Sequence, residues 1–346
     1  MRALKWLFIV IVALIVGVVV GGFFLPDQAR VERSIVVSSK PSTVYTALNG
    51  FGQFNRWSPW ADLDPQTRYT LSGPLIGVGA RLAWASDDPN VGAGSQEIIE
   101  VVPDERVRMR LIFAGFDSEN YSTHQLVPEG EGTRVVWSYD TQFHGNLLGR
   151  YFGLMLDGML GPDYEKGLAR FKEVVEGLPQ DDLSAHDITL VDVPSRPIAY
   201  VAGVTRAEEA EPTLAAAYRS IEAYFAANGL MAAEPPLAIT RHFDDATKQW
   251  RFEAALVPNR DELPPPADST VQLGRTYTGP ALRVSHRGAA ADLDAAYQAM
   301  IVFKSVASLQ DNGDSWEQYR EGVPGASTAD ATTEVFWPVK LVMAAP

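Results

Sequence analysis

Residues 105–141 read ERVRMRLIFAGFDSENYSTHQLVPEGEGTRVVWSYDT, and their alternation of polar and apolar side chains sets the architecture of the first half of the chain. One face of the first strand carries Val107, Met109, Leu111 and Phe113. The intervening Arg108 and Arg110 point to the opposite face, because successive side chains of a strand alternate. A hairpin turn at Gly130-Glu131-Gly132 follows, and the pattern then returns with Val135, Trp137 and Tyr139. The segment therefore predicts antiparallel strands with one buried face.

The flanking sequence extends this sheet and adds helices. Val31–Ser38 is a β-branched run that predicts a strand, and Lys40–Leu48 predicts a short helix. Further strands are expected at 67–71, 79–86, 94–102, 105–114, 118–128 and 133–141. A long helix is expected over Asn146–Glu176, with Pro162 kinking or restarting it near Gly161. The order is strand, short helices, antiparallel meander and long helix.

A local motif accompanies this order. Asn55–Trp60 reads NRWSPW and is followed by Gly73, by Gly77-Val78-Gly79 and by Trp84. Together with the order of elements, the motif resembles the SRPBCC superfamily, which includes START-like lipid carriers and polyketide cyclase-like proteins. The resemblance covers roughly residues 30–178 and implies a helix-grip fold, in which a curved sheet wraps one long helix around a cavity. It does not imply one activity, because the superfamily contains carriers, hydrolases and cyclases.

Four tryptophans are candidates for the walls of that cavity. They are Trp57, Trp60, Trp84 and Trp137. The alternative for each is packing in the core, because aromatic side chains bury a large area wherever they lie.

The second half of the chain has a duplicated pattern. Strands are expected at 187–193, 197–205, 237–243, 249–257, 270–277, 281–287 and 332–340. Helices are expected over Pro212–Asn228 and Asp292–Gln310, one in each half. Ala216-Ala217-Tyr218 in the first helix matches Ala295-Ala296-Tyr297 in the second, so the domain is expected to contain two copies of one unit.

Three segments resemble the GyrI-like domain, which is the effector-binding domain of bacterial transcription activators. They are Ser285-His286-Arg287-Gly288, Trp316-Glu317-Gln318-Tyr319 and Thr333-Glu334-Val335-Phe336-Trp337-Pro338-Val339. The family's last-strand glutamate lies in an aromatic-lined groove between the two halves, where it faces the positive charge of an amphipathic ligand. Glu334 is the matching residue, and an arginine partner or exposure to solvent is its alternative.

The same resemblance implies further groove residues. They are Trp316, Tyr319, Tyr277 and Tyr200, with core packing as the alternative for each. The family usually carries an aromatic residue soon after the His-x-Gly element, whereas Ala289, Ala290 and Ala291 follow here, and the ligand class is therefore open. The usual helix-turn-helix partner is missing, so the resemblance implies ligand binding without direct control of transcription.

The N-terminal segment Trp6–Leu25 contains no charged or polar side chain. As a helix rising about 1.5 Å per residue it spans roughly 30 Å, the thickness of a bilayer's hydrocarbon core. A secretory signal has a shorter apolar region and a small-x-small cleavage site, whereas this run ends in GGFFLP. An uncleaved anchor is expected, and a cleaved signal is the alternative. Arg2 and Lys5 precede the span, which predicts a cytoplasmic N-terminus and domains outside the inner membrane.

Composition excludes several kinds of site. The chain has no cysteine, which excludes disulfides, thiolate catalysis and cysteine-based metal sites. The net charge is −14, so a phosphate backbone would be repelled and no nucleic-acid partner is expected. The histidines have no metal-ligand spacing, and no serine-hydrolase or phosphate-binding motif is present. No metal, cofactor or catalytic residue is therefore predicted, and the oligomeric state is open.

The predicted chain is α+β, with an anchor at residues 1–28, a helix-grip domain at 29–178, a linker at 179–185 and a GyrI-like domain at 186–346. The first functional hypothesis is membrane-anchored binding of hydrophobic or amphipathic small molecules, lipid-like or cationic, without catalysis. The second is a cyclase- or hydrolase-like enzyme acting on an apolar substrate. The third is a tethered interaction module of the cell envelope.

Overall fold

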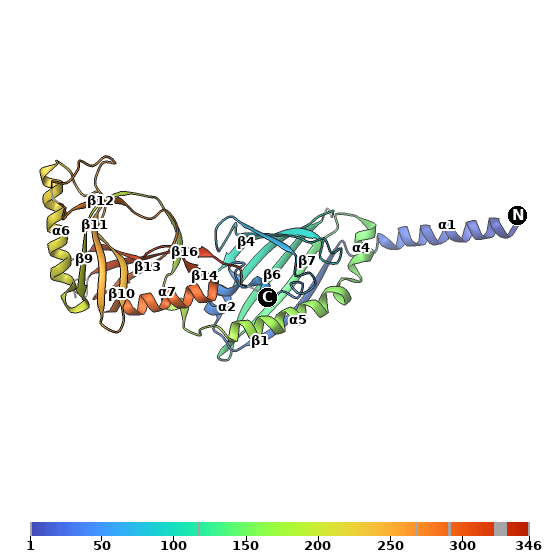
Figure 1. Ribbon diagram of the computed structural model, residues 1–346. Coiled ribbons are helices and arrows are strands. Elements are labelled where there is room, and N and C mark those ends of the chain that lie inside the picture. Colours follow the sequence, from blue (N-terminus) through green and yellow to red (C-terminus); the bar gives the residue numbers. More distant parts are fainter. Residues whose placement is uncertain (1, 116–117, 268, 290–291, 322–330, 345–346) are drawn as a thin grey trace. The chain divides into compact units, whose positions relative to one another are not determined.

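The computed structural model describes residues 2–115, 118–267, 269–289, 292–321 and 331–344 (Figure 1). The chain forms two compact units, of which the first contains residues up to Gln180 and the second contains Asp181–Ser305 and Leu309–Val342. The fold class is α+β, as predicted: an apolar N-terminal helix precedes two antiparallel sheets. The predicted domain boundaries themselves stay a prediction.

Helix α1 (Arg2–Gly22) is apolar and exposed along its length. Within the described residues, the segment Leu4–Gly22 is the one stretch long and apolar enough to cross a membrane. A signal sequence passes the same test, so the helix by itself fixes neither a span nor its sidedness.

An antiparallel sheet of seven strands, counted over the described residues, dominates the first unit. The strands are β1 (Gln28–Val37), β2 (Arg68–Ser72), β3 (Arg81–Ala85), β4 (Ala93–Val102), β5 (Arg106–Phe113), β6 (Glu119–Glu129) and β7 (Gly132–Gln142). Their order in the sheet is β1-β7-β6-β5-β4-β3-β2, so the six-stranded meander closes with β1 beside its last strand. Strands were expected at all seven places, β1 from its β-branched run and the others as the segments that follow it, with alternation marking the buried faces of β5 and β7.

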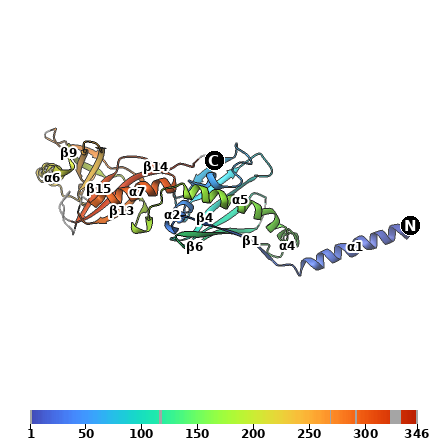
Figure 2. The ribbon, with the colours of Figure 1, turned by 90° about the horizontal axis from the view of Figure 1, so that it is seen from below.

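Four helices complete the first unit, and the long one lies over one face of the sheet (Figure 2). They are α2 (Pro41–Leu48), α3 (Phe54–Trp57), α4 (Leu147–Gly153) and α5 (Leu156–Glu176). The expected restart near Gly161 is wrong, because α5 continues through Pro162 and the break lies between Gly153 and Leu156. Pro162 leaves the carbonyl of Gly158 without its helical donor, and Gly158 is exposed, so water can replace that bond.

A cluster of stacked rings joins α5 to the sheet. Trp137 of β7 stacks on Tyr164 of α5 with centroids 3.8 Å apart, and on the buried ring of His124 at 5.3 Å. Trp57 meets Trp137 edge to face at 5.4 Å. Gly167 permits this approach, because a Cβ there would lie 2.8 Å from the Trp137 ring. The helix is thus held close to the sheet at this level.

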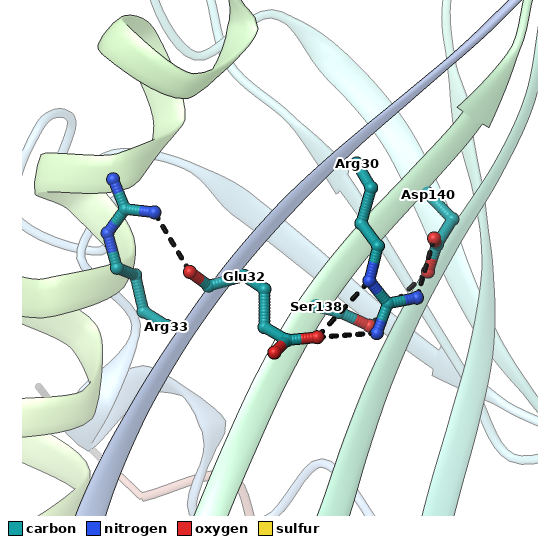
Figure 3. A network of polar contacts seen from close by, with 5 residues as sticks. All are labelled: Arg30, Glu32, Arg33, Ser138 and Asp140. Carbon is teal, nitrogen blue, oxygen red and sulfur yellow. Dashed lines mark hydrogen bonds and ion pairs between the residues drawn. The ribbon is translucent and has the colours of Figure 1, made fainter.

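Ionic contacts join β1 to β7 and to α5, and Figure 3 shows those of Arg30 with Glu32 and Asp140. On one face, Arg30 donates to Glu32 at 2.6 Å and to Asp140 of β7 at 2.8 Å. On the helix side, Arg33 donates to Asp157 and Glu165 of α5 at 2.9 and 2.8 Å. Because these groups are mostly exposed, the pairs orient the elements more than they stabilise them.

A sheet with a duplicated strand order forms the second unit. Its strands, within the described part of the chain, are β8 (Thr189–Val193), β9 (Pro197–Arg206), β10 (Leu237–Asp244), β11 (Gln249–Leu256), β12 (Gln272–Arg275), β13 (Gly279–Arg287), β14 (Leu309–Asp311), β15 (Trp316–Glu321) and β16 (Thr332–Leu341). The main order is β12-β9-β11-β10-β15-β16-β13-β8, which reads as two equivalent halves meeting at β10 and β15. The first strand of each half pairs with a strand of the other half. Strand β8 pairs with β13, and β12 pairs with β9.

Both helices of this unit cover the same face of its sheet. Helix α6 (Ala210–Ala227) packs on β9 and β11, and the Tyr297 ring of α7 (Leu293–Ala307) meets Trp337 of β16 at 5.9 Å. Strands β14 and β15 were not among the expected strands. Strand β15 contains the Trp316–Tyr319 segment, which had been expected only to follow the second helix.

The buried imidazole of His124 predicts a pH dependence of stability. Burial lowers the pKa of His124 to about 3 from its ordinary 6.5, and neither ring nitrogen has a hydrogen-bond partner. Between these values the unfolded chain binds a proton that the folded chain does not, so the free energy of unfolding falls by about 1.4 kcal/mol per pH unit as the pH decreases.

The variant His124→Phe keeps a ring in the stack and removes this titration. Urea unfolding at pH 7 and pH 5 should therefore show about 2 kcal/mol less loss of stability for His124→Phe than for the wild type. The exposed His242→Phe variant is the matched control and should lose as much as the wild type. Equal losses in all three proteins would contradict a neutral, buried His124.

Candidate functional site

A cavity of about 670 Å³ lies between the sheet and the helices of the first unit. Strand β5 runs from the packed core to the cavity. Val107 and Met109 are buried in the core, whereas Leu111 and Phe113, further along the same face, line the cavity. The predicted apolar face of this strand is confirmed, and it serves as core at one end and as cavity wall at the other.

A row of polar side chains crosses the cavity wall. Gln96, Leu111, Asn120 and Thr141 are paired in register across β4, β5, β6 and β7. The buried Asn120 Oδ1 accepts hydrogen bonds from the Tyr139 hydroxyl at 2.7 Å and the Thr141 hydroxyl at 2.8 Å. The Asn120 side-chain oxygen therefore has hydrogen-bond partners within the protein.

Gln96 differs, because its Nε2 is buried and has no hydrogen-bond partner. The side chain is 5% exposed and belongs to the cavity wall. A buried amide donor without an acceptor costs free energy. A guest molecule whose acceptor reached this amide would satisfy it.

The remaining chemistry of the wall is uncharged. Its described residues include no Asp, Glu, Lys, Arg or His. The wall contains Tyr139 and Tyr164, and burial raises the pKa of both hydroxyls, so they stay protonated. The site offers apolar surface and hydrogen bonds but no acid–base pair.

The four tryptophans expected at this cavity divide into two groups. Trp60 and Trp84 line it, with their ring N–H groups donating to the Asp163 carboxylate at 3.2 Å and to the Val91 carbonyl at 3.4 Å. Trp57 and Trp137 lie in the ring cluster that joins α5 to the sheet, where each is less than 5% exposed. Trp57 and Trp137 therefore pack in the core, which was the alternative given for them.

A carboxylate lies among tyrosines on the helix-covered face of the second unit. Glu317 of β15 accepts a hydrogen bond from Tyr297 of α7 at 3.0 Å and one from Tyr319 at 2.8 Å. Burial raises the pKa of Glu317, and burial together with the nearby Glu317 charge raises the pKa of Tyr218 on α6. No basic side chain in the described part of the chain pairs with it.

The duplicated sequence contains the signal for this cluster. Tyr218 and Tyr297 are the tyrosines of the two matching Ala-Ala-Tyr segments, and they approach Glu317 from the two helices. The 79 residues that separate them also separate Ala238 from Glu317, and these last two are direct partners between β10 and β15. Glu317 therefore lies in the second half of the repeat. The equivalent position in the first half is Ala238, and the two residues are neighbours across the strand pair.

Glu334 lies on the opposite face of the sheet. It is paired in register with Gln318, whereas Glu317 and Tyr319 alternate to the helix side. Its carboxylate accepts from Arg320 at 2.6 Å and lies 3.9 Å from Arg283. Its charge is therefore already compensated, and its role toward a ligand stays a prediction.

The other expected groove residues fall on both faces. Trp316 and Tyr277 line a smaller pocket of about 270 Å³ with Arg241 and Arg275, on the face that also carries Glu334. Tyr319 is on the helix side beside Glu317. Tyr200 donates to the Gln272 side chain at 2.9 Å and packs against the apolar cluster around Trp316.

The alanines after the His-x-Gly element are only partly described. His286 lies 3.2 Å from the carbonyl of Ala289. Ala290 and Ala291 lie outside the described residues, so the effect of this departure on the groove stays open.

The comparisons with known proteins identify the families of the two domains. Residues 28–176 match the family described as polyketide cyclase/dehydrase and lipid transport. Residues 186–340 match the GyrI-like small molecule binding domain. The chain carries an SRPBCC-like domain followed by a GyrI-like domain. Both resemblances stated from the sequence are confirmed, and both families are associated with small molecules.

Solved structures are similar to parts of the chain at low identity. The EcmrR–DNA complex is 14% identical over 57% of this chain and 72% of that chain, with a TM-score of 0.41. The EcmrR C-terminal domain is 16% identical over 45% and 99%, with a TM-score of 0.39. A hydrolase from Listeria innocua is 18% identical over 44% and 91%, with a TM-score of 0.35. No curated protein matches the sequence. The expectation that the chain binds no nucleic acid remains a prediction.

The two glutamates make different predictions for a lipophilic cation such as tetraphenylphosphonium. Glu317→Gln removes an uncompensated carboxylate among aromatic rings, so affinity should fall at least tenfold. Glu334→Gln removes a carboxylate that two arginines already compensate, so affinity should change less than twofold. Equilibrium dialysis with the detergent-solubilised chain measures both. Loss of binding with Glu334→Gln alone would assign the site to the opposite face.

Proposed function

We propose that this protein is a membrane-anchored binder of amphipathic small molecules and that it performs no catalysis. The observation that carries the proposal is the 670 Å³ cavity of the SRPBCC-like domain, with its uncharged wall and its free Gln96 donor. Pockets of this size that combine apolar walls with a few polar groups are typical ligand sites. Catalysis would need a titratable acid–base pair, which this wall does not supply.

The chemistry of the wall defines the ligand of the first domain. A charged group would enter without a counter-ion, so an ionised head is disfavoured. An acceptor such as a carbonyl satisfies the Gln96 amide, while the surfaces of Trp84, Phe113 and Phe143 take an apolar tail. The ligand is therefore an uncharged amphiphile with a hydrogen-bond acceptor.

The GyrI-like domain takes a second ligand class in this proposal. Glu317 has two phenol donors and no basic partner in the described part of the chain. A cation with an apolar body would gain both the charge of the carboxylate and the faces of the surrounding rings. Glu317 is therefore our preferred cation site, and Glu334 is the alternative that the paired substitutions test.

Helix α1 supplies the anchor in this account. Its apolar length is sufficient to span a bilayer, and Arg2 and Lys5 favour a cytoplasmic N-terminus. Both domains would then lie outside the inner membrane, separated by the linker at 179–185. Alkaline phosphatase fused after residue 40 should be active, and an inactive fusion would reverse the orientation.

The ligand class is tested with a doxyl-labelled stearic acid methyl ester, which is uncharged and has an ester carbonyl. Bound ester should quench tryptophan fluorescence through Trp84 and Trp60, and the ionised free acid at pH 8 should bind at least tenfold more weakly. Gln96→Leu should weaken ester binding about five- to tenfold, since one hydrogen bond contributes about 1 kcal/mol. It should not lower stability, because this amide donor has no protein partner.

Leu111→Trp is the companion variant, because it fills the cavity between Gln96 and Asn120. Binding of the ester should be lost in this variant while the cation still binds at the second domain. Equal affinity of the wild type and Leu111→Trp for the ester would show that the ester does not bind in the cavity.

A further inference from the structure

Five large apolar side chains in the described part of the first unit are exposed along one rim of the cavity. They are Leu148, Phe152, Leu154, Met155 and Met159, and we call them the rim surface. They lie on α4, on the turn after it and on the start of α5. Leu148, Phe152 and Met159 also line the cavity, so the exposed apolar surface continues into it. Exposed apolar patches of this kind mark interaction surfaces.

Helix α4 is tied to the end of α1. The Tyr151 hydroxyl donates to the Val18 carbonyl at 2.6 Å. The Arg150 guanidinium donates to the carbonyls of Gly22, Phe23 and Leu25 at 3.2–3.3 Å. Phe23 and Phe24 are themselves exposed at this end of the helix. The rim surface therefore lies beside the last turn of the apolar helix.

The charges next to the rim surface are compensated. Arg150 has a side chain that is only 15% exposed, and it pairs with Asp27 at 3.1 Å. Asp157 pairs with Arg33 at 2.9 Å. The rim therefore presents apolar side chains without an unpaired ion between them and α1. Such a surface enters the boundary between headgroups and acyl chains through its apolar area.

We propose that the rim surface docks on the lipid bilayer that holds α1, so that the cavity of the first domain opens onto the lipid phase. This inference rests on the proposed function and names the source of its ligand, which would pass between bilayer and cavity without crossing water. The bilayer is the occupant because the rim surface lies beside the end of α1, where Tyr151 and Arg150 of α4 donate four hydrogen bonds to carbonyls of residues 18–25. Arg150 donates a fifth to the Asp27 carboxylate. A partner protein is the less favoured occupant, because it would have to cover the rim surface right beside a helix that is inserted in the membrane.

The absence of cysteine permits a direct test in the full-length chain in phosphatidylcholine vesicles. Met155→Cys lies on the rim surface outside the cavity wall, and Val127→Cys is an exposed apolar position on β6 as control. Each is labelled with nitrobenzoxadiazole. Brominated lipids should quench the label at Met155→Cys by at least half and leave Val127→Cys unchanged. Equal, weak quenching of both would overturn the proposal, and so would a blue-shifted label at Met155→Cys that lipids do not quench, because a protein would then cover the rim.

A second arm separates docking from binding. Leu154→Gln combined with Met155→Gln alters the rim but not the cavity wall, so the doxyl methyl ester should bind with unchanged affinity in detergent. Its uptake from vesicles should slow at least fivefold, whereas Val127→Gln should have no effect. Unchanged uptake would refute docking and leave the binding function standing. Failure of the wild type to bind the ester in detergent would refute the binding function, while the lipid quenching would still decide docking.

Discussion

The stack of Trp137 on Tyr164 is the contact on which the first domain depends. It fixes α5 close to the sheet at the level of Gly167, where a larger residue would meet the Trp137 ring. Tyr164 also lines the cavity, and the first turns of α5 carry the buried Leu156 and the half-buried Leu160 to the same wall. The stack therefore lies at the border between the packed core and the cavity. Protein interiors are generally close-packed, so an unfilled volume of this size supports the proposed binding of a guest molecule.

The second domain forms its proposed cation site by a different route. Two copies of one unit meet between β10 and β15, and their helices bring equivalent tyrosines to the same face. The copies differ at one central position, where Glu317 faces Ala238. A buried carboxylate has a free-energy cost in a duplicated core, and the two phenol hydroxyls offset only part of it. The asymmetry between the halves is what gives this face a charge.

Much of the fold followed from the sequence, because periodicity reports which face of a strand is buried. A β-branched run located β1, alternation marked the buried faces of β5 and β7, and the repeat of Ala-Ala-Tyr predicted the duplication. Periodicity does not report whether a helix covers that face at a given level. Trp84 and Trp137 have the same pattern, yet one lines the cavity and the other packs in the core.

The second site was harder to predict because it depends on a strand that the sequence did not indicate. Only when Trp316–Tyr319 is recognised as part of a strand does alternation place Glu317 and Tyr319 on one face of the sheet and Trp316 on the other. The family resemblance pointed to the last strand and to Glu334, whose charge turns out to be compensated by Arg320. Long-range pairings of this kind are not encoded in local spacing.

Native mass spectrometry of the full-length chain, released from detergent after purification from its own membranes, tests the central claim most directly. The account requires a population whose mass exceeds that of the bare chain by one uncharged amphiphile, and the loss of that population when Leu111 is replaced by Trp. A single bare mass for the wild type, unchanged after incubation with extracted membrane lipids, would contradict it.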